Sequence, residues 1–181
     1  MSFLKLITKR YSCRKYRIQS VEDDKIELCI EAARIAPSAS NSQPWRFIVV
    51  NDPERKEKIA SETYNSLVSF NKFVHQAPVI IVIVLEKPKL ITQIGNKIKN
   101  KEWPLIDIGI AAEHFCLQAA ELGLGTCMLG WYNEKAIKKL LNIPASKTIA
   151  LLISLGYPDK ETAPEKKRKS REEMLSFNGY S

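Results

Sequence analysis

The sequence is poor in the residues that build metal sites and covalent cross-links. Its 181 residues include four cysteines and two histidines, no CxxC pair occurs, and His75 and His114 stand apart from any Cys-rich cluster. This spacing argues against a zinc site, and a chain of this length with so few cysteines does not need a disulfide framework. We therefore expect buried or half-buried thiols in a reducing cytosol, at Cys13, Cys29, Cys116 and Cys127.

Long apolar runs and phosphate-binding glycine motifs are also lacking. The longest apolar run, Ala77 to Leu85, is about half the length of a membrane span. In the first ten residues the basic side chains follow the apolar patch and no small-residue cleavage site occurs, so we do not expect a secretory signal. Neither GxGxxG nor GxxxxGK[ST] is present, which argues against a Rossmann dinucleotide site and a P-loop.

The composition otherwise fits a globular protein with a surplus of positive charge. A hydrophobic fraction of 45% and a charged fraction of 27% exclude a wholly disordered chain. The length predicts one domain over residues 1–181 that buries about 70% of its unfolded surface. The net charge of +8 has three explanations: nucleic-acid binding, an anionic small ligand, or solubility.

Helical and extended patterns are mixed along the whole chain. Helices are predicted from Ser20 to Pro37, Glu54 to about Leu67, Pro104 to Leu122 and Asn133 to Leu141. Strands are predicted at Arg46–Val50, Val79–Leu85, Thr126–Trp131, Thr148–Leu155 and, near the end, Met174–Phe177. Residues 86–103 are irregular and basic. These patterns predict one α+β domain in which helices flank a sheet of about four or five strands.

A basic cluster near the start of the chain has the chemistry of a phosphate site. In the run Lys9–Tyr16, Arg10 and Arg14 are four residues apart and share a face if the segment is helical or turn-like. Ser12 adds a hydroxyl between them, and phosphate is well bound by guanidinium donors together with neutral ones. The alternative is a solvated basic helix end.

Two further segments carry groups suited to a ligand. The loop within Ala36–Phe47 consists of small and amide side chains, which let a flat heterocycle approach the backbone and hydrogen-bond at its edge. In the run Gly123–Trp131, Gly130 can present a bare backbone N–H, although a helix stop followed by a core strand explains this run as well.

The remaining candidates carry less chemistry. Pro164–Arg171 holds five basic residues and one acid, as in a nucleic-acid patch, but lacks the interleaved aromatics of a single-strand binder. His75 and His114 have no Ser, Cys or Asp partner in a catalytic motif, which favours structural roles. Cys13 lies beside Arg14 and near Arg10, which would favour its thiolate, but no motif makes it a nucleophile.

Taken in order, these segments resemble the FMN-dependent nitroreductases. Arg10-Tyr-Ser-x-Arg14 resembles the RRSxR-type opening of that family, with Tyr11 at its second Arg position. Ala36-Pro-Ser-x-x-Asn-x-Gln-Pro-Trp-x-Phe47 resembles the family signature APSxxNxQPWxF, which is long and specific. The family order continues through Leu122–Thr126, Gly130, Leu155–Pro158 and Lys166-x-Arg-Lys169, so that the resemblance covers nearly the whole chain.

The resemblance implies roles for particular residues. The phosphate of FMN would be held by Arg10 and Ser12, with Tyr11 beside them, and by Lys166 and Arg168, where Lys169 can take one of these places. Arg14, with Lys72 as a looser candidate, would supply a cation at the flavin pyrimidine edge and stabilise the reduced flavin. The flavin would be lined by Ser38, Ser40, Asn41 and Gln43, often from the partner subunit, and its N5 atom would face the backbone of Leu129, Gly130 and Trp131.

The resemblance also implies an assembly and an activity. It implies a three-layer fold with a mostly antiparallel sheet and a homodimer with two flavins at the interface, in which the C-terminal arm, about residues 159–181, reaches over the partner. NAD(P)H would pass hydride to flavin N5 in a ping-pong cycle, and a nitroaromatic, quinone or similar flat acceptor would then collect it. No catalytic side chain, nucleic acid, metal or membrane is implied. The short chain predicts an acceptor pocket that is open or formed by residues 86–103 with Trp103.

Two other interpretations remain at this point. One keeps the flavin but changes the task, as in a reductive dehalogenase with weak nitroreductase activity. The other is a basic nucleic-acid-binding domain that uses Pro164–Arg171.

Overall fold

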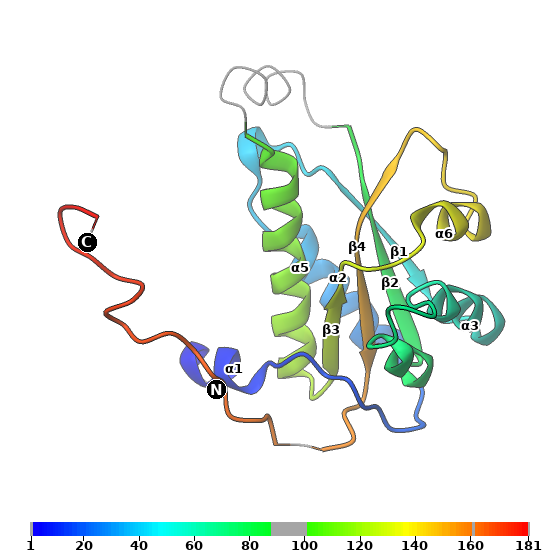
Figure 1. Cartoon of the computed structure of the whole chain (residues 1–181), viewed down its shortest axis with the longest axis horizontal. Coiled ribbons are helices and arrows are strands. Elements are labelled where there is room, and N and C mark those ends of the chain that lie inside the picture. Colours follow the sequence, from blue (N-terminus) through cyan, green and yellow to red (C-terminus); the bar gives the residue numbers. More distant parts are fainter. Residues whose placement is uncertain (1, 88–100, 161, 181) are drawn as a thin grey trace.

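A four-stranded antiparallel sheet forms the centre of the structure (Figure 1). The computed structural model describes residues 2–87, 101–160 and 162–180. The strands lie in the order β1-β2-β4-β3, and every neighbouring pair is antiparallel: β1 (Trp45–Val50), β2 (Val79–Leu85), β3 (Gly125–Leu129) and β4 (Thr148–Gly156). The α+β class and the mostly antiparallel sheet predicted from the sequence are confirmed.

The central strand β2 explains why the fold has three layers. All of its residues are apolar, and all but Leu85 are buried. Successive side chains of a strand point to opposite faces, so an unbroken apolar run requires a cover on both sides. Ile81 and Ile83 accordingly belong to one buried cluster, and Ile80 and Val82 belong to the other.

Helices cover the sheet on both faces. One face packs against α2 (Asp23–Arg34) and α5 (Trp103–Glu121), and the other against α3 (Pro53–Ser61), the 3-10 helix η2 (Lys72–Gln76) and α6 (Glu134–Leu140). The short helix α1 (Phe3–Lys9) lies beside α5, and the 3-10 turn η1 (Ala39–Asn41) precedes β1. None of the helices formed by the described residues has the length and apolar character needed to span a bilayer.

The segment that follows α1 lies along the free edge of β3. Ser12 forms a parallel bridge to Thr126, the Cys13 N–H donates to the Thr126 carbonyl at 2.8 Å, and Tyr16 bridges Pro158. The close approach depends on a missing side chain, because a Cβ on Gly125 would lie 2.8 Å from the Cys13 Sγ. This contact fixes the path of the basic segment Arg10–Arg14.

Several predicted boundaries differ from the structure. The first predicted helix begins at Asp23 rather than Ser20, since the two acids of its first turn favour the positive helix end and Val21 is buried outside it. The helix after β1 ends at Ser61 rather than Leu67, because the Asn65 side chain accepts the Leu67 and Val68 N–H groups and forms a turn. Met174–Phe177 is not a strand: it lies exposed and pairs with no described segment. Residues 88–100 of the predicted irregular region lie outside the described residues.

Candidate functional site

The basic opening segment is extended rather than helical. Arg10 is the C-cap of α1 and has φ −64° and ψ 128°, so the chain leaves the helix there. The predicted shared face of Arg10 and Arg14 required a helical or turn-like segment, and the structure instead places Arg10 in one cavity beside this segment and Arg14 in another. Cys13 points inward and is buried, whereas Ser12 and Arg14 are exposed.

Two residues predicted to bind phosphate, Arg10 and Lys166, lie together near the end of α1, and the charge of a third, Arg168, acts on Lys166. The Lys166 ammonium donates to the carbonyls of Ile7 (2.6 Å) and Arg10, which brings the C-terminal segment against the opening segment. Burial, together with the positive charges of Arg10 and Arg168, lowers the pKa of Lys166. Arg10 and Lys166 are far apart in the sequence, and the fold brings them into contact.

One carboxylate that sequence analysis missed belongs to this cluster. Glu113 of α5 pairs with Arg10 through Oε1 and Nε at 3.1 Å, and its charge also acts on Lys166. The Arg10 side chain is only 21% exposed, so the pair is partly shielded from solvent. The cluster of Arg10, Lys166, Arg168 and Glu113 therefore retains a net positive charge.

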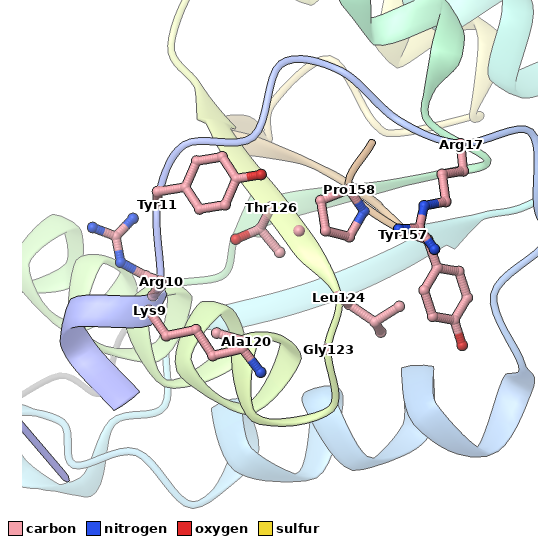
Figure 2. A pocket seen from close by; sticks show the side chains of 11 residues that line it. Lys9, Arg10, Tyr11, Arg17, Ala120, Gly123, Leu124, Thr126, Tyr157 and Pro158 are labelled. Atoms are coloured by element: carbon pink, nitrogen blue, oxygen red, sulfur yellow. The ribbon is translucent and has the colours of Figure 1, made fainter. Parts of the chain in front are cut away.

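Two cavities flank the opening segment. The first encloses about 420 Å³, and Figure 2 shows the side chains around it, with the Tyr11 ring facing Thr126 and the Lys9 side chain running beside Ala120. It is lined by Lys9, Arg10, Tyr11, Arg17, Ala120, Gly123, Leu124, Gly125, Thr126, Tyr157 and Pro158. The second, of about 510 Å³, contains Ser12 and Arg14 and is closed by residues 159, 160 and 162–164.

Side chains between these cavities have shifted acidities. Burial, with the neighbouring Cys13, raises the pKa of Tyr11 to about 12, and its hydroxyl donates to the Lys160 carbonyl at 3.3 Å. Burial also raises the pKa of Cys127, while Arg14 and the Ser12 hydroxyl oppose that rise. Ser12 and Arg14 therefore act on the same point of β3.

The loop from Ser38 to Gln43 has an unusual backbone. Ser40, Asn41 and Gln43 have φ values of 52°, 50° and 47°, the left-handed region that side chains other than glycine rarely adopt. Inside the loop the Ser38 hydroxyl accepts the Gln43 N–H at 3.0 Å, and the Asn41 side chain accepts the Gln43 amide at 2.7 Å. At its base Asp107 of α5 accepts the Ala39 N–H at 3.0 Å.

The loop and the opening segment are attached to different faces of α5. The loop is tied to Asp107 and the opening segment to Glu113. Residues six positions apart on an α-helix point in directions that differ by about 120°, so these two anchors leave α5 in different directions. Figure 1 shows η1 beside the start of α5 and α1 toward its other end. The loop lines neither of the two cavities described above.

The end of β3 offers backbone rather than side chains. The Leu129 side chain is buried in the core, so only its main chain is available to a ligand. A Cβ on Gly130 would meet no atom within 4 Å, which leaves the backbone there open. Trp131 is about half exposed, and the buried Asn71 holds its carbonyl by a bond of 3.2 Å.

The other candidates have structural partners. His75 lies 2.5 Å from Glu57 and 3.1 Å from the Tyr64 hydroxyl, and His114 lies against the Ala32 carbonyl. All four cysteines are free and buried, as predicted, and the Cys13 thiol donates to the Lys15 carbonyl. Lys72 lies over the Tyr64 ring. Within the described ranges, His, Cys, Asp and Glu form no group able to hold a metal ion.

Comparison with known proteins gives a consistent family. The profile described as "Nitroreductase family" matches residues 7–70 and 61–157. A protein of Archaeoglobus fulgidus, named as a candidate NADH dehydrogenase/NAD(P)H nitroreductase, is 38% identical over 162 residues, which cover 87% of this chain and 86% of that protein. The mouse protein named iodotyrosine deiodinase 1 is 28% identical over 96% of this chain and 68% of its own length.

Solved structures agree with the sequence matches. The solved structure of the FMN-dependent nitroreductase of Clostridium difficile R20291 superposes with a TM-score of 0.76 at 31% identity, over 98% of this chain and all of that one. The family profile covers the opening segment, the loop and the end of β3, and it ends at residue 157, before Lys166 and Arg168. The chain belongs to the nitroreductase family.

Proposed function

We propose that this protein is an FMN-dependent NAD(P)H oxidoreductase that reduces nitroaromatics, quinones or similar flat acceptors. The observation that carries the proposal is the contact between Lys166 and Arg10, from opposite ends of the chain, with Glu113 paired to Arg10 and the charge of Arg168 acting on Lys166. The names of relatives that reduce nitro compounds with NAD(P)H, and of an FMN-dependent neighbour, support the same activity.

The cation cluster fits a phosphate group. A phosphate monoester carries about −1.5 to −2 charges at neutral pH, which suits three cations and one carboxylate. The ion pair with Glu113 uses Nε of Arg10, and a guanidinium has further N–H donors with which to hold a second anion. Burial and, after it, the positive charges of Arg10 and Arg168 lower the pKa of Lys166, and a bound phosphate would offset the repulsion among these cations.

The remaining predicted residues fit the rest of the cofactor. Ser12 and Arg14 are exposed on the same side of the opening segment, so they place a hydroxyl and a cation beyond the phosphate cluster. The backbone at Gly130 is open, and the Trp131 ring is available for stacking. When bound, FMN accepts hydride from NAD(P)H and passes it to the acceptor. The chain's own task is to bind and orient, and no side-chain acid or base is required.

The site calls for a second copy of the chain. The loop Ser38–Gln43 and the opening segment leave α5 in different directions, so one copy would supply the phosphate cluster and its partner the loop. The C-terminal arm projects away from the sheet in Figure 1 and exposes a row of apolar side chains: Met174, Leu175, Phe177 and Tyr180. A homodimer of one-domain subunits, with the arm of each subunit over the other, would cover them.

The visible spectrum of the purified protein tests the proposal most directly. We expect a yellow protein, or a colourless one that becomes yellow and retains FMN after reconstitution and desalting. With flavin bound, NAD(P)H oxidation should accelerate on addition of a nitrofuran or a quinone. A protein that remains colourless after incubation with FMN would refute the proposal.

Reductive dehalogenation is a second candidate, favoured by the deiodinase relative that matches 96% of the chain. It uses the same flavin site with a halogenated aromatic as acceptor. Halide release from iodotyrosine, measured with reduced flavin under anaerobic conditions beside nitrofuran reduction, separates the two activities.

A further inference from the structure

A buried acid of α5 lies under the loop that is proposed to line the flavin. Asp107, in the second turn of α5, is 3% exposed. Its Oδ1 accepts the Ala39 N–H at 3.0 Å, and its Oδ2 is buried without a hydrogen-bond partner among the described residues. Burying a carboxylate with one oxygen unsatisfied costs stability, so packing of the fold alone gives no reason for an acid here.

The strained backbone of the loop above Asp107 requires contacts with the rest of the fold that stabilise it. Three of its residues, none of them glycine, have left-handed backbone angles. Such conformations cost energy at each residue and persist only where the surroundings fix them. Hydrogen bonds within the loop, such as those of Gln43 to Ser38 and Asn41, connect its residues to one another, whereas the Asp107 bond fixes the loop to a long helix.

We propose that Asp107 is a positioning residue for flavin binding. It acts through Ala39 and holds the loop in the strained shape in which Ser40, Asn41 and Gln43 face the cofactor. The inference rests on the proposed function, since it assumes that this loop lines the flavin. A charged acceptor makes a stronger hydrogen bond to a backbone N–H than a neutral one, which favours a carboxylate at this position.

Two variants that branch at Cγ, as aspartate does, separate this role from simple core packing. Asp107→Asn keeps an oxygen that can accept the Ala39 N–H, and Asp107→Leu removes every acceptor. We expect Asp107→Leu to weaken the binding of FMN and of riboflavin by about tenfold each, because the loop contacts the flavin ring and not the phosphate. Asp107→Asn should bind both flavins with an affinity within about threefold of that of the unsubstituted protein. It should also keep the visible spectrum of the bound flavin, which Asp107→Leu should shift.

A double-mutant cycle with Asn41→Ala tests whether Asp107 acts through the loop. If it does, Asp107→Leu should weaken flavin binding by less than about threefold once the Asn41 amide is gone. An effect of equal size with and without Asn41 would overturn the inference. So would an Asp107→Leu protein with unaltered flavin affinity and spectrum, or a loss with Asp107→Asn as large as with Asp107→Leu.

The same measurements distinguish the two levels of the argument. If the unsubstituted protein binds no flavin, the proposed function fails and the inference fails with it. If that protein binds flavin and the Asp107 variants bind it equally well, the inference alone fails.

Discussion

Arg10 gives the sharpest prediction at the scale of single residues. Arg10→Ala removes a guanidinium from the proposed phosphate cluster, and hydrogen bonds to charged groups contribute about 1.5–3 kcal/mol. We expect FMN binding to weaken by about 10- to 100-fold, and riboflavin binding by less than about threefold, in a fluorescence titration with both ligands. Arg168→Ala should show the same pattern.

The neighbour Lys167 provides the matched control for these variants. It is an exposed cation on the same arm, and only its carbonyl is tied to Arg168. Lys167→Ala should leave the affinity for both ligands unchanged. Equal losses of FMN and riboflavin binding in Arg10→Ala would contradict the phosphate assignment.

The lowered pKa of Lys166 predicts a pH dependence of FMN binding. The ammonium form attracts phosphate, and a lysine whose pKa lies below the usual 10.5 loses its proton at a correspondingly lower pH. FMN affinity should therefore fall as the pH rises through that lowered pKa, while riboflavin affinity stays constant. Binding titrations between about pH 7 and about pH 10 measure the ratio of FMN affinity to riboflavin affinity, which should fall as the pH rises.

Lys166→Arg supplies the test of the cause. Arginine remains charged over this range, so the fall in FMN affinity should disappear in the variant. A fall of the same size in Lys166→Arg would assign the pH dependence to another group.

Sequence analysis found the cations of the site but not the acids. Arg10, Lys166 and Arg168 stand in motifs whose order is recognisable, and the structure brings them together. Glu113 and Asp107 lie within an otherwise apolar helical pattern, and their partners are far away in the chain. An acid at a core position of that pattern was a visible signal for Asp107. The identity of its partner depends on tertiary packing, which sequence spacing does not reveal.

At the scale of elements, strands were predicted better than helix ends. β2 begins and ends as predicted, because its apolar run is unbroken and Pro78 precedes it. The helix α6 has the predicted cap, since the Asn133 side chain accepts the Ala136 N–H. By contrast, two helix ends and one strand were predicted wrongly, because they are decided by side-chain turns and by burial. They are the start of α2, the end of α3 and the strand expected at Met174–Phe177. Local residue propensity predicts neither side-chain turns nor burial well.

The anchoring of the opening segment predicts a stability effect at Gly156. A Cβ there would lie 2.6 Å from Pro78 Cδ and 2.9 Å from the buried Tyr16 ring, and neither atom moves easily. We expect Gly156→Ala to lower the free energy of unfolding by about 1–3 kcal/mol in urea denaturation. Gly179→Ala, where a Cβ meets no atom within 4 Å, should change it by less than about 0.5 kcal/mol. Equal stability of the two variants would mean that the close packing at Gly156 carries no constraint.

At the scale of the whole molecule, exposed apolar side chains concentrate where the proposed site is incomplete. Many of them lie on α1, at the start of α5 and along the C-terminal arm, and include Phe3, Leu4, Trp103, Leu105 and Ile106; others, such as Ile18, Leu67 and Phe70, lie elsewhere. Large apolar patches rimmed by polar residues mark interaction surfaces. The net charge of +8 agrees with this proposal, since part of the positive charge belongs to a cluster that would hold two negative charges of a cofactor. The composition reveals the excess of positive charge, but only the fold shows which of the charged side chains lie together.

Assembly and flavin binding should therefore be lost together. Ile106→Asp would place a charge within the proposed interface, and burying an unpaired carboxylate costs several kcal/mol. We expect the unsubstituted protein to sediment as a dimer, and Ile106→Asp to sediment as a monomer that no longer retains FMN, because the partner's loop is missing. Ile18→Asp is the control, since Ile18 is fully exposed and belongs to the segment between Tyr16 and α2 rather than to α1, the start of α5 or the arm. It should remain dimeric and yellow. A monomer that holds FMN as firmly as the dimer would show that one chain completes the site. The separate attachment of the loop at Asp107 and of the opening segment at Glu113 would then need another explanation.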